Sequence, residues 1–163
     1  MTHETPLVVV TGPPDAALVA TALAERLGCA YVSLGEIEDE LAVDAEDTPR
    51  SWLRYDAEQE VVRRLTEFSG AAVLDVAVDP PLEAERVKAL VRRWWDDVVE
   101  VRCEAPGLTY DGLGASRTVV LDASRPLVVG EIAAVVRRET ATHRRVRRAS
   151  RDESLGPPGS LGF

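Results

Sequence analysis

Five short apolar runs alternate along the chain with longer stretches in which apolar residues recur every three or four positions. The runs are Leu7–Thr11, Ala30–Ser33, Ala71–Asp75, Val98–Cys103 and Thr118–Asp122. They are apolar almost throughout and do not alternate with polar residues, which is typical of strands buried on both faces of a parallel sheet. The intervening stretches predict helices over residues 15–27, about 36–42, 49–68, from 79 through 94, and from about 127 onward.

This order of elements predicts a single α/β domain over residues 1–150. Because right-handed crossovers connect parallel strands, we expect a three-layer, doubly wound sandwich. Its five-stranded, mainly parallel sheet carries helices on both faces. Ligands of such sheets bind beyond the carboxyl ends of the strands, so a site is expected there. The Ser-, Gly- and Pro-rich residues 151–163 predict a disordered tail.

Composition narrows the class of protein. A formal charge of −9 with 45% apolar residues fits a soluble globular protein and opposes a general affinity for nucleic acid or anionic membranes. Cys29 and Cys103 do not form a disulfide framework or a metal-ligand spacing, so we expect a reducing, cytoplasmic environment and no metal site. The sequence shows no charged-then-apolar leader and no apolar run of membrane-spanning length, so no membrane partner is expected.

The segment after the first run has the layout of a phosphate-binding loop. A β-branched strand breaks at Gly12-Pro13-Pro14, and an Ala/Leu-rich helix follows from Asp15. Such loops follow the pattern G-x-x-x-x-G-K-[ST], in which backbone N–H groups wrap phosphates, lysine supplies charge and the hydroxyl holds Mg²⁺. Counted from Gly12, the last three positions are occupied as follows: Ala17, Leu18 and Val19. The frame of the loop is present, but its charge and its magnesium ligand are missing.

Asp15 lies at the start of this helix, where the partial positive charge of the helix normally attracts phosphate. One interpretation is that its carboxylate replaces the missing anionic ligand from within the chain. The other is an ordinary helix N-cap with no bearing on ligands. The two are compatible.

Four fragments in order resemble the P-loop small-molecule kinases of the adenylate, shikimate and gluconate kinase type, over roughly residues 7–138. The fragments are Val8–Pro14, Ala24–Ser33, Ala72–Asp75 and Val119–Leu127. The resemblance implies a P-loop fold with a degenerate Walker A loop. It also implies ATP and Mg²⁺ as cofactors if the protein is active.

Two further positions depart from the family. Gly35 stands where these kinases commonly place an aspartate after the second strand, and Glu36 could replace it only in a shifted register. Only Ala105 to Arg117 fills the position of the family's arginine-bearing helical lid, which is too short for a lid of ordinary length. The remaining catalytic candidates are Asp75, Glu36 and Arg117. For Asp75 the alternatives are a metal ligand and a structural cap on a neighbouring turn.

Arginines are concentrated near the end of the last predicted helix. Seven of the nineteen cationic residues lie within fifteen positions: Arg137, Arg138, Arg144, Arg145, Arg147, Arg148 and Arg151. They fit a solvated helix end, a surface that docks on acidic groups of the same or a partner chain, or a contact to nucleic-acid phosphates.

Three functions follow from these observations. The sequence favours a kinase-like protein that has lost phosphoryl transfer, needs no cofactor, and acts as a regulatory or accessory protein through a protein partner or a homo-oligomer. An ATP-dependent small-molecule kinase with a non-standard loop is the alternative. Nucleic-acid binding through the Arg-rich helix is a third, which the pI of about 4.8 disfavours.

Overall fold

The computed structural model of the chain describes residues 6–68, 71–79, 81–105, 112–115, 117–122 and 129–154, and side chains in the last of these ranges at 129–141 and 149. The strands are β1 (Leu7–Thr11), β2 (Ala30–Ser33), β3 (Ala72–Asp75), β4 (Val98–Glu104) and β5 (Thr118–Asp122). The helices are α1 (Ala16–Leu27), α2 (Leu34–Ala42), α3 (Arg50–Glu67), α4 (Ala84–Leu90), the 3₁₀ helix η1 (Arg92–Asp97) and α5 (Val129–Ser154).

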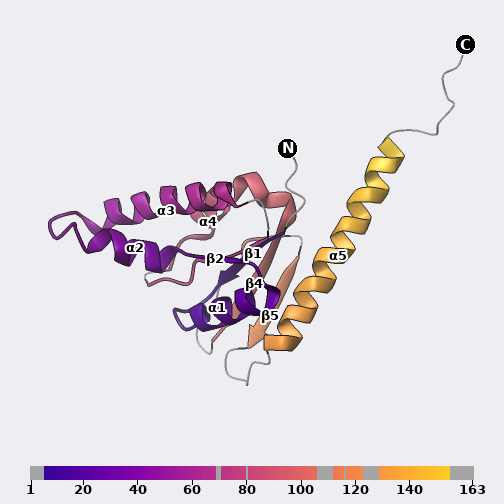
Figure 1. The fold of residues 1–163 in the computed structure, drawn as a ribbon, viewed down its shortest axis with the longest axis horizontal. Helices are drawn as coiled ribbons and strands as arrows, with labels where there is room; N and C mark the ends of the chain where they lie inside the picture. The colour runs from indigo at the N-terminus through magenta and orange to yellow at the C-terminus, as the bar shows by residue number, and fades with distance from the viewer. Residues whose placement is uncertain are drawn as a thin grey trace, which may run out of the picture.

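The five strands form one sheet in the order β2-β3-β1-β4-β5, and all four pairings are parallel (Figure 1). β1 is the central strand, and its Val8, Val9 and Val10 are almost fully buried. The chain moves from β1 to one side of the sheet for β2 and β3, and to the other side for β4 and β5. This arrangement confirms the predicted α/β fold, with a sheet that is parallel throughout the described strands.

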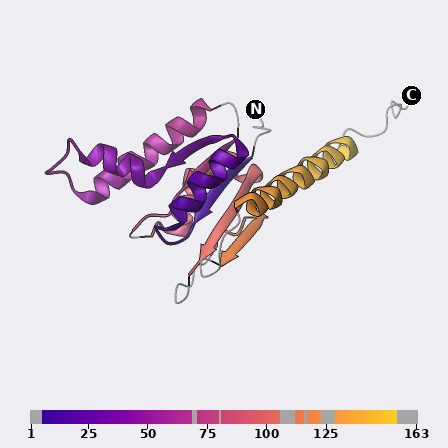
Figure 2. The ribbon, with the colours of Figure 1, turned by 60° about the horizontal axis from the view of Figure 1, so that its bottom comes forward.

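Two apolar layers cover the sheet. On one face α1 and the first turns of α5 pack against Val8, Val10 and Val101. On the other face α2, α3, α4 and η1 pack against Val9 and Leu74. Figure 2 shows α1 lying over the strands beside the start of α5. The helices on both faces give the three-layer sandwich that the sequence predicts.

Three predicted helix boundaries differ from the structure. The helix expected to start at Asp79-Pro80-Pro81 begins at Ala84, because a residue that precedes proline is restricted away from the helical region. It also ends at Leu90, and the buried Trp94 belongs to η1. The last helix runs through Ser154, so residues 151–154 are helical although the sequence predicted a disordered tail from 151. Residues 155–163 of that tail lie outside the described residues.

α5 packs against the rest of the fold over its first turns. Ile132, Ala133 and Val136 are buried against α1 and β4, whereas Ala141 and Ala149 are exposed. The second half of the helix extends away from the sheet in Figures 1 and 2. α5 is the longest helix, and neither it nor any other described helix is apolar enough over a membrane-spanning length to cross a bilayer.

The start of α2 yields a first prediction. The Ser33 Oγ accepts a hydrogen bond from the Glu36 backbone N–H at 3.2 Å and so caps this helix. We expect Ser33→Ala to lower the free energy of unfolding by about 1 kcal/mol, as loss of an N-cap typically does. Urea unfolding followed by far-ultraviolet circular dichroism measures the change.

Thr66→Ala is the matched control, because the Thr66 hydroxyl donates to the Val62 carbonyl one turn back, inside α3. Alanine is the better helix former at such a position, so this variant should be no less stable than the wild type. Equal stability of Ser33→Ala and the wild type would contradict the capping role.

Candidate functional site at the carboxyl edge of the sheet

The carboxyl ends of β1 and β3 adjoin at the switch point of the sheet, where the chain changes direction of winding. An open crevice of about 290 Å³ lies there, between the turn after β1, the segment after β3, and helices α2 and α3. It is lined by Pro14, Gly35, Glu38, Asp39, Ala42, Arg50, Leu53, Ala77, Val78 and Asp79. This is the position at which the sequence analysis expected a ligand site.

The crevice has an anionic lining. Its lining contains three carboxylates, Glu38, Asp39 and Asp79, and one cation, Arg50. Glu38 is held by the buried Arg54, whose Nε lies 2.8 Å from the carboxylate. Asp39 and Asp79 are exposed. A cationic group fits this lining better than a phosphate does.

The turn between β1 and α1 is closed by its own backbone. The Ala16 N–H donates to the Pro13 carbonyl at 2.8 Å, and the Ala17 N–H donates to the Pro14 carbonyl at 3.1 Å. The Leu18 N–H donates to the Asp15 carbonyl at 3.2 Å. Pro13 and Pro14 have no N–H at all. Five positions of this segment, 13, 14, 16, 17 and 18, therefore offer no free backbone donor to a ligand.

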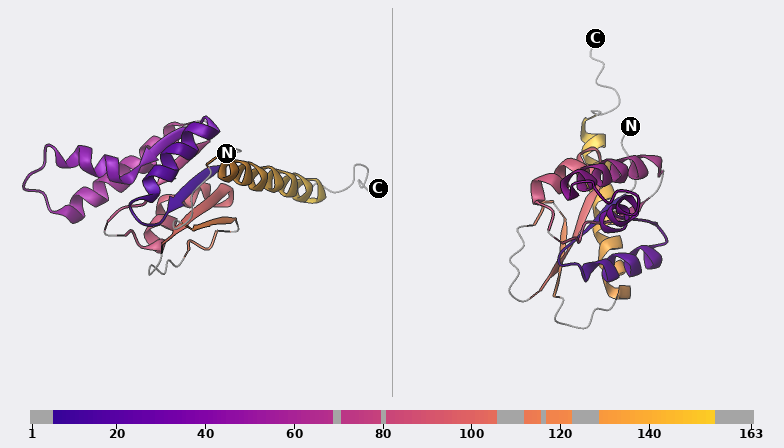
Figure 3. Two further views of the ribbon diagram at one scale, coloured as in Figure 1. Left: turned by 90° about the horizontal axis from the view of Figure 1, so that it is seen from below. Right: turned by 90° about the vertical axis from the view of Figure 1, so that its left-hand side faces the viewer.

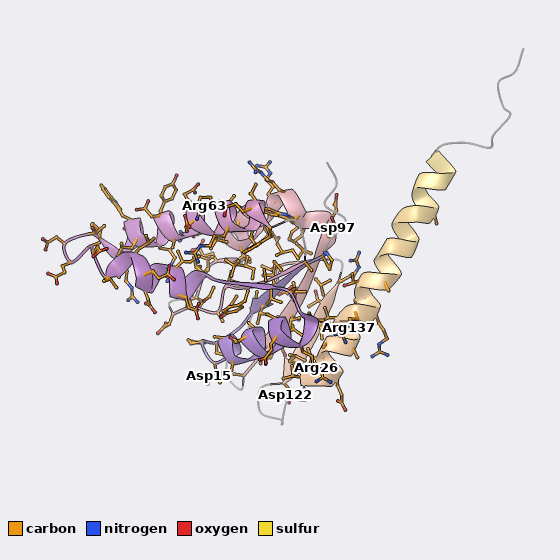
Figure 4. The ribbon with its side chains drawn as sticks, in the orientation of Figure 1. Asp15, Arg26, Arg63, Asp97, Asp122 and Arg137 are labelled. Carbon is orange, nitrogen blue, oxygen red and sulfur yellow. The ribbon has the colours of Figure 1, made fainter. Side chains whose placement is uncertain are left out.

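The side chains of this turn point to no common centre. Leu18 is 76% exposed, Val19 is buried in the core and Ala17 is partly buried. Asp15 is exposed and makes no capping hydrogen bond to α1. The N-cap interpretation of Asp15 was therefore wrong, because its backbone already has helical dihedral angles and holds the side chain away from the N–H groups. Figure 4 shows Asp15 at the end of α1 opposite to Arg26.

Gly12 brings the turn into close contact with β4. Its φ of +141° suits only glycine, and an added Cβ would lie 2.6 Å from the Cys103 carbonyl oxygen and 2.9 Å from its Cβ. Cys103 is buried, and burial, together with the charge of Asp75, raises the pKa of its thiol to about 11. This thiol stays protonated at neutral pH, as expected of a packing residue.

Asp75 has both carboxylate oxygens occupied within the fold. The Ala77 N–H donates to Oδ1 at 2.8 Å and the Tyr31 hydroxyl donates to Oδ2 at 2.9 Å. The first of these bonds caps the turn that follows β3, as the structural interpretation predicts. Burial raises the pKa of Asp75, and the nearby Glu36 acts in the same direction, although both hydrogen bonds oppose the rise.

Of the three catalytic candidates, only two share a neighbourhood. Glu36 is exposed in the first turn of α2, near enough to Asp75 to influence its pKa. Arg117 precedes β5 at the amino end of that strand, and its carbonyl accepts from the Glu100 N–H. The structure therefore places Arg117 away from the carboxyl edge. No group of three or more potential metal ligands occurs among the described residues.

Sequence reasoning missed a buried carboxyl group. Glu100 is fully buried in β4, where it accepts hydrogen bonds from the Thr11 hydroxyl at 3.1 Å and the Leu113 N–H at 3.0 Å. Leu113 is itself buried in the core and belongs to the segment between β4 and β5. The sequence does contain a signal for this buried carboxyl group, since Glu100 is the only charged residue in the run Val98-Val99-Glu100-Val101.

The space beside Glu100 is nearly filled. It amounts to about 10 Å³, which is room for one water molecule, and Leu82, Val87 and Leu113 are among its walls. The described part of the segment after β4, residues 112–115, contains no helix. This segment packs Leu113 against the sheet.

The arginines of the Arg-rich stretch lie on two parts of α5: the part that contacts α1, and the half that extends from the sheet. The Arg137 guanidinium donates to the Arg26 carbonyl at 3.0 Å, in the last turn of α1, and so fastens α5 to that helix (Figure 4). Arg138 also has an interaction partner. Five of the seven arginines lie on the half of α5 that extends from the sheet, and their side chains are outside the described residues: Arg144, Arg145, Arg147, Arg148 and Arg151.

Three solved structures share this architecture. A candidate kinase from Chloroflexus aurantiacus J-10-fl superposes with a TM-score of 0.64 at 14% identity, covering 83% of this chain and 98% of the other. A gluconokinase from Sinorhizobium meliloti 1021 gives 0.58 at 16% identity, with 94% and 99% covered. An unliganded sugar kinase from Janibacter sp. HTCC2649 gives 0.50 at 13% identity, with 84% and 93% covered.

These similarities confirm that the chain has the fold of small-molecule kinases, as its sequence resemblance implied. At such identities they show the fold alone. No protein-family model and no curated protein matches the chain.

The packing of the turn after β1 gives a second prediction. Gly12→Ala should lower the free energy of unfolding by about 2–4 kcal/mol, because it combines an unfavourable φ with a clash against Cys103. Gly28→Ala is the control: Gly28 also has a positive φ, of 65°, but nothing lies near an added Cβ. That variant should lose only about 1–2 kcal/mol. Equal losses in urea unfolding would show that the contact with Cys103 is not tight.

A third prediction concerns pH. Because the folded-state pKa of Asp75 is raised above its ordinary 3.8, its protonation favours the folded state. This contribution is fully present below the unfolded pKa and is lost as pH rises through the folded pKa. The stability of the wild type relative to Asp75→Asn should therefore fall across that window and then level off, as measured by urea unfolding at several pH values.

Tyr31→Phe provides the control for this titration. It removes the hydroxyl that donates to Asp75, so it should raise the pKa further and move the window to higher pH. A stability difference between the wild type and Asp75→Asn that does not vary with pH would refute the titration.

Proposed function

We propose that this protein uses a kinase fold for binding and not for phosphoryl transfer, as a regulatory or accessory protein that acts through a protein partner. The observation that carries the proposal is the self-closed turn after β1. There the N–H groups of residues 16 to 18 donate to carbonyls of residues 13 to 15.

Phosphate loops bind because several backbone N–H groups point outward at one anion. In this turn two residues lack an N–H and three others have theirs occupied. Freeing the occupied donors would cost the turn its hydrogen bonds and leave three carbonyls to be solvated. The degenerate Walker A loop thus lacks the backbone geometry as well as the lysine and hydroxyl side chains.

Charge supports the same proposal. Phosphoryl transfer depends on positioning and on cations that stabilise the transferring group. Position 18 is an exposed leucine, and Asp15, Asp39 and Asp79 are exposed carboxylates at or beside the crevice. Arg50 is the cation in its lining. The carboxylates of the crevice would repel a nucleoside triphosphate. We therefore propose that the binding function requires no nucleotide and no Mg²⁺.

Titration with Mg·ATP tests the proposal. At 100 times its dissociation constant a ligand adds about 2.7 kcal/mol to stability, which raises the melting temperature of a domain of this size by several degrees. We expect no rise at about 1 mM ATP, where any dissociation constant below about 10 µM would produce that full effect. A saturable rise, with heat of binding by calorimetry, would instead favour an ATP-dependent kinase with a non-standard loop.

Two restored variants make the test sharper. The first carries Ala17→Gly, Leu18→Lys and Val19→Thr, together with Asp15→Gly, and restores the side chains alone. The second adds Pro14→Ser, which returns a backbone donor to the turn. If the backbone is the limiting factor, only the second variant should gain ATP affinity; gain in the first would assign the loss to side chains.

A further inference from the structure

The two most highly charged parts of the chain lie at opposite ends of the molecule. Residues 36–60, here called the acidic hairpin, span α2 and most of α3 and contain ten carboxylates and two arginines. Residues 137–151 contain seven arginines and one glutamate, a net charge of +6, which leaves −15 on the remainder of the chain. Figure 1 and the left panel of Figure 3 both show the hairpin and the extended half of α5 pointing in opposite directions.

Many carboxylates of the hairpin are open to a partner. Within the described residues no ion pair involves Asp39, Asp44, Glu46, Asp47 or Asp56, and all five are exposed. By contrast Glu38, Glu58 and Glu60 are paired with arginines within the hairpin or next to it. The free carboxylates gather at the end of the hairpin where α2 joins α3.

Aromatic rings lie among these carboxylates. Trp52 and Tyr55, three residues apart in α3, are 67% and 59% exposed, and Val43 in the preceding turn is 76% exposed. Residues at this spacing share one helix face. Exposed tryptophan and tyrosine beside carboxylates form a surface on which guanidinium groups both stack and pair with charge. This is the chemistry of a binding surface for arginine.

The extended half of α5 carries the complementary groups. Its arginines recur at the helical spacings of three and four, as in 144/147/148 and 147/151, so they repel one another along the helix. The backbone of this half of α5 extends away from the sheet (Figure 2). A surface of opposite charge would stabilise it.

We propose that the extended half of α5 docks on the acidic hairpin of a second copy of this chain, which gives a reciprocal dimer. The hairpin of the same chain is excluded because it lies at the opposite end of the molecule from the extended half of α5 in Figures 1 and 2 and in the left panel of Figure 3. In the dimer the arginine helix of each copy binds the acidic hairpin of the other. The two contacts are equivalent and form a closed, two-fold symmetric dimer. This inference names the partner of the proposed binding function and rests on it, while its readout is independent of nucleotide.

Sedimentation velocity of the nuclease-treated full chain tests the dimer. We expect twice the 17.7 kDa mass at about 50 mM salt and the monomer mass at about 500 mM, since screening weakens contacts between exposed charges. A wild type that is monomeric at low salt and high concentration overturns the proposal, as does a monomer that binds duplex DNA. Either result would leave the ATP titration unaffected.

Charge reversal identifies the two surfaces. The arm variant changes Arg144, Arg145, Arg147 and Arg148 to Glu; the hairpin variant changes Asp44, Glu46, Asp47 and Asp56 to Lys. Each alone should be monomeric, and an equimolar mixture should restore a mass of two chains. A mixture that stays monomeric, or an arm variant that still dimerises, overturns the pairing. Arg92→Glu with Arg93→Glu, on exposed residues of η1, is the control and should leave the dimer intact.

The aromatic contribution has its own variant. Trp52→Ala with Tyr55→Ala should weaken dimerisation at least tenfold without changing the melting temperature, because both rings are mostly exposed. Leu18→Ala, at an equally exposed site on α1, should change neither quantity. Unchanged dimerisation of the aromatic variant would show that these rings are not part of the contact.

Discussion

The closing of the first turn on its own hydrogen bonds governs what the carboxyl edge of this sheet offers to a ligand. A turn between a buried strand and a buried helix has to satisfy its N–H groups either internally or on a bound anion. Here Pro13 and Pro14 remove two donors, and the carbonyls of residues 13 to 15 accept from the N–H groups of residues 16 to 18. These three donors are satisfied without a ligand. Gly12 fits it tightly against Cys103, so the turn and the end of β4 hold each other in place.

Two buried carboxyl groups of the neighbouring strands are satisfied in the same manner. The carboxyl group of Asp75 is held by Ala77 and Tyr31, and that of Glu100 by Thr11 and Leu113. Such groups are costly to bury unless they are hydrogen-bonded, and the partners come from the fold itself. Leu113 is also among the residues that line the small space beside Glu100. These two carboxyl groups therefore stabilise the chain's own loops.

Much of this could be predicted from the sequence. The five strands were found because each is an apolar run with no alternation, and the missing cation and hydroxyl were found because Leu18 and Val19 stand at fixed offsets from Gly12. The internal hydrogen bonds of the N–H groups of residues 16 to 18 were not predictable. They depend on the dihedral angles of Asp15, which are helical and place this residue inside the helical turn. The bond from Leu113 to Glu100 joins residues thirteen positions apart, across a loop without a periodic pattern. The run of arginines predicted a charged helix but not how far α5 extends beyond the sheet.

Charge is distributed unevenly over this fold. In a nucleotide-binding protein, cations gather at the carboxyl edge of the sheet. In this chain the crevice at that edge has an anionic lining, and five arginines lie in the far half of α5. Arg137 belongs to neither group, because it anchors the helix to α1 and fixes the direction in which the remaining arginines are presented. A rigid sheet with one anchored helix thus keeps two opposite charges apart within one molecule. Charges held apart in this way cannot neutralise each other internally and so favour association with another molecule.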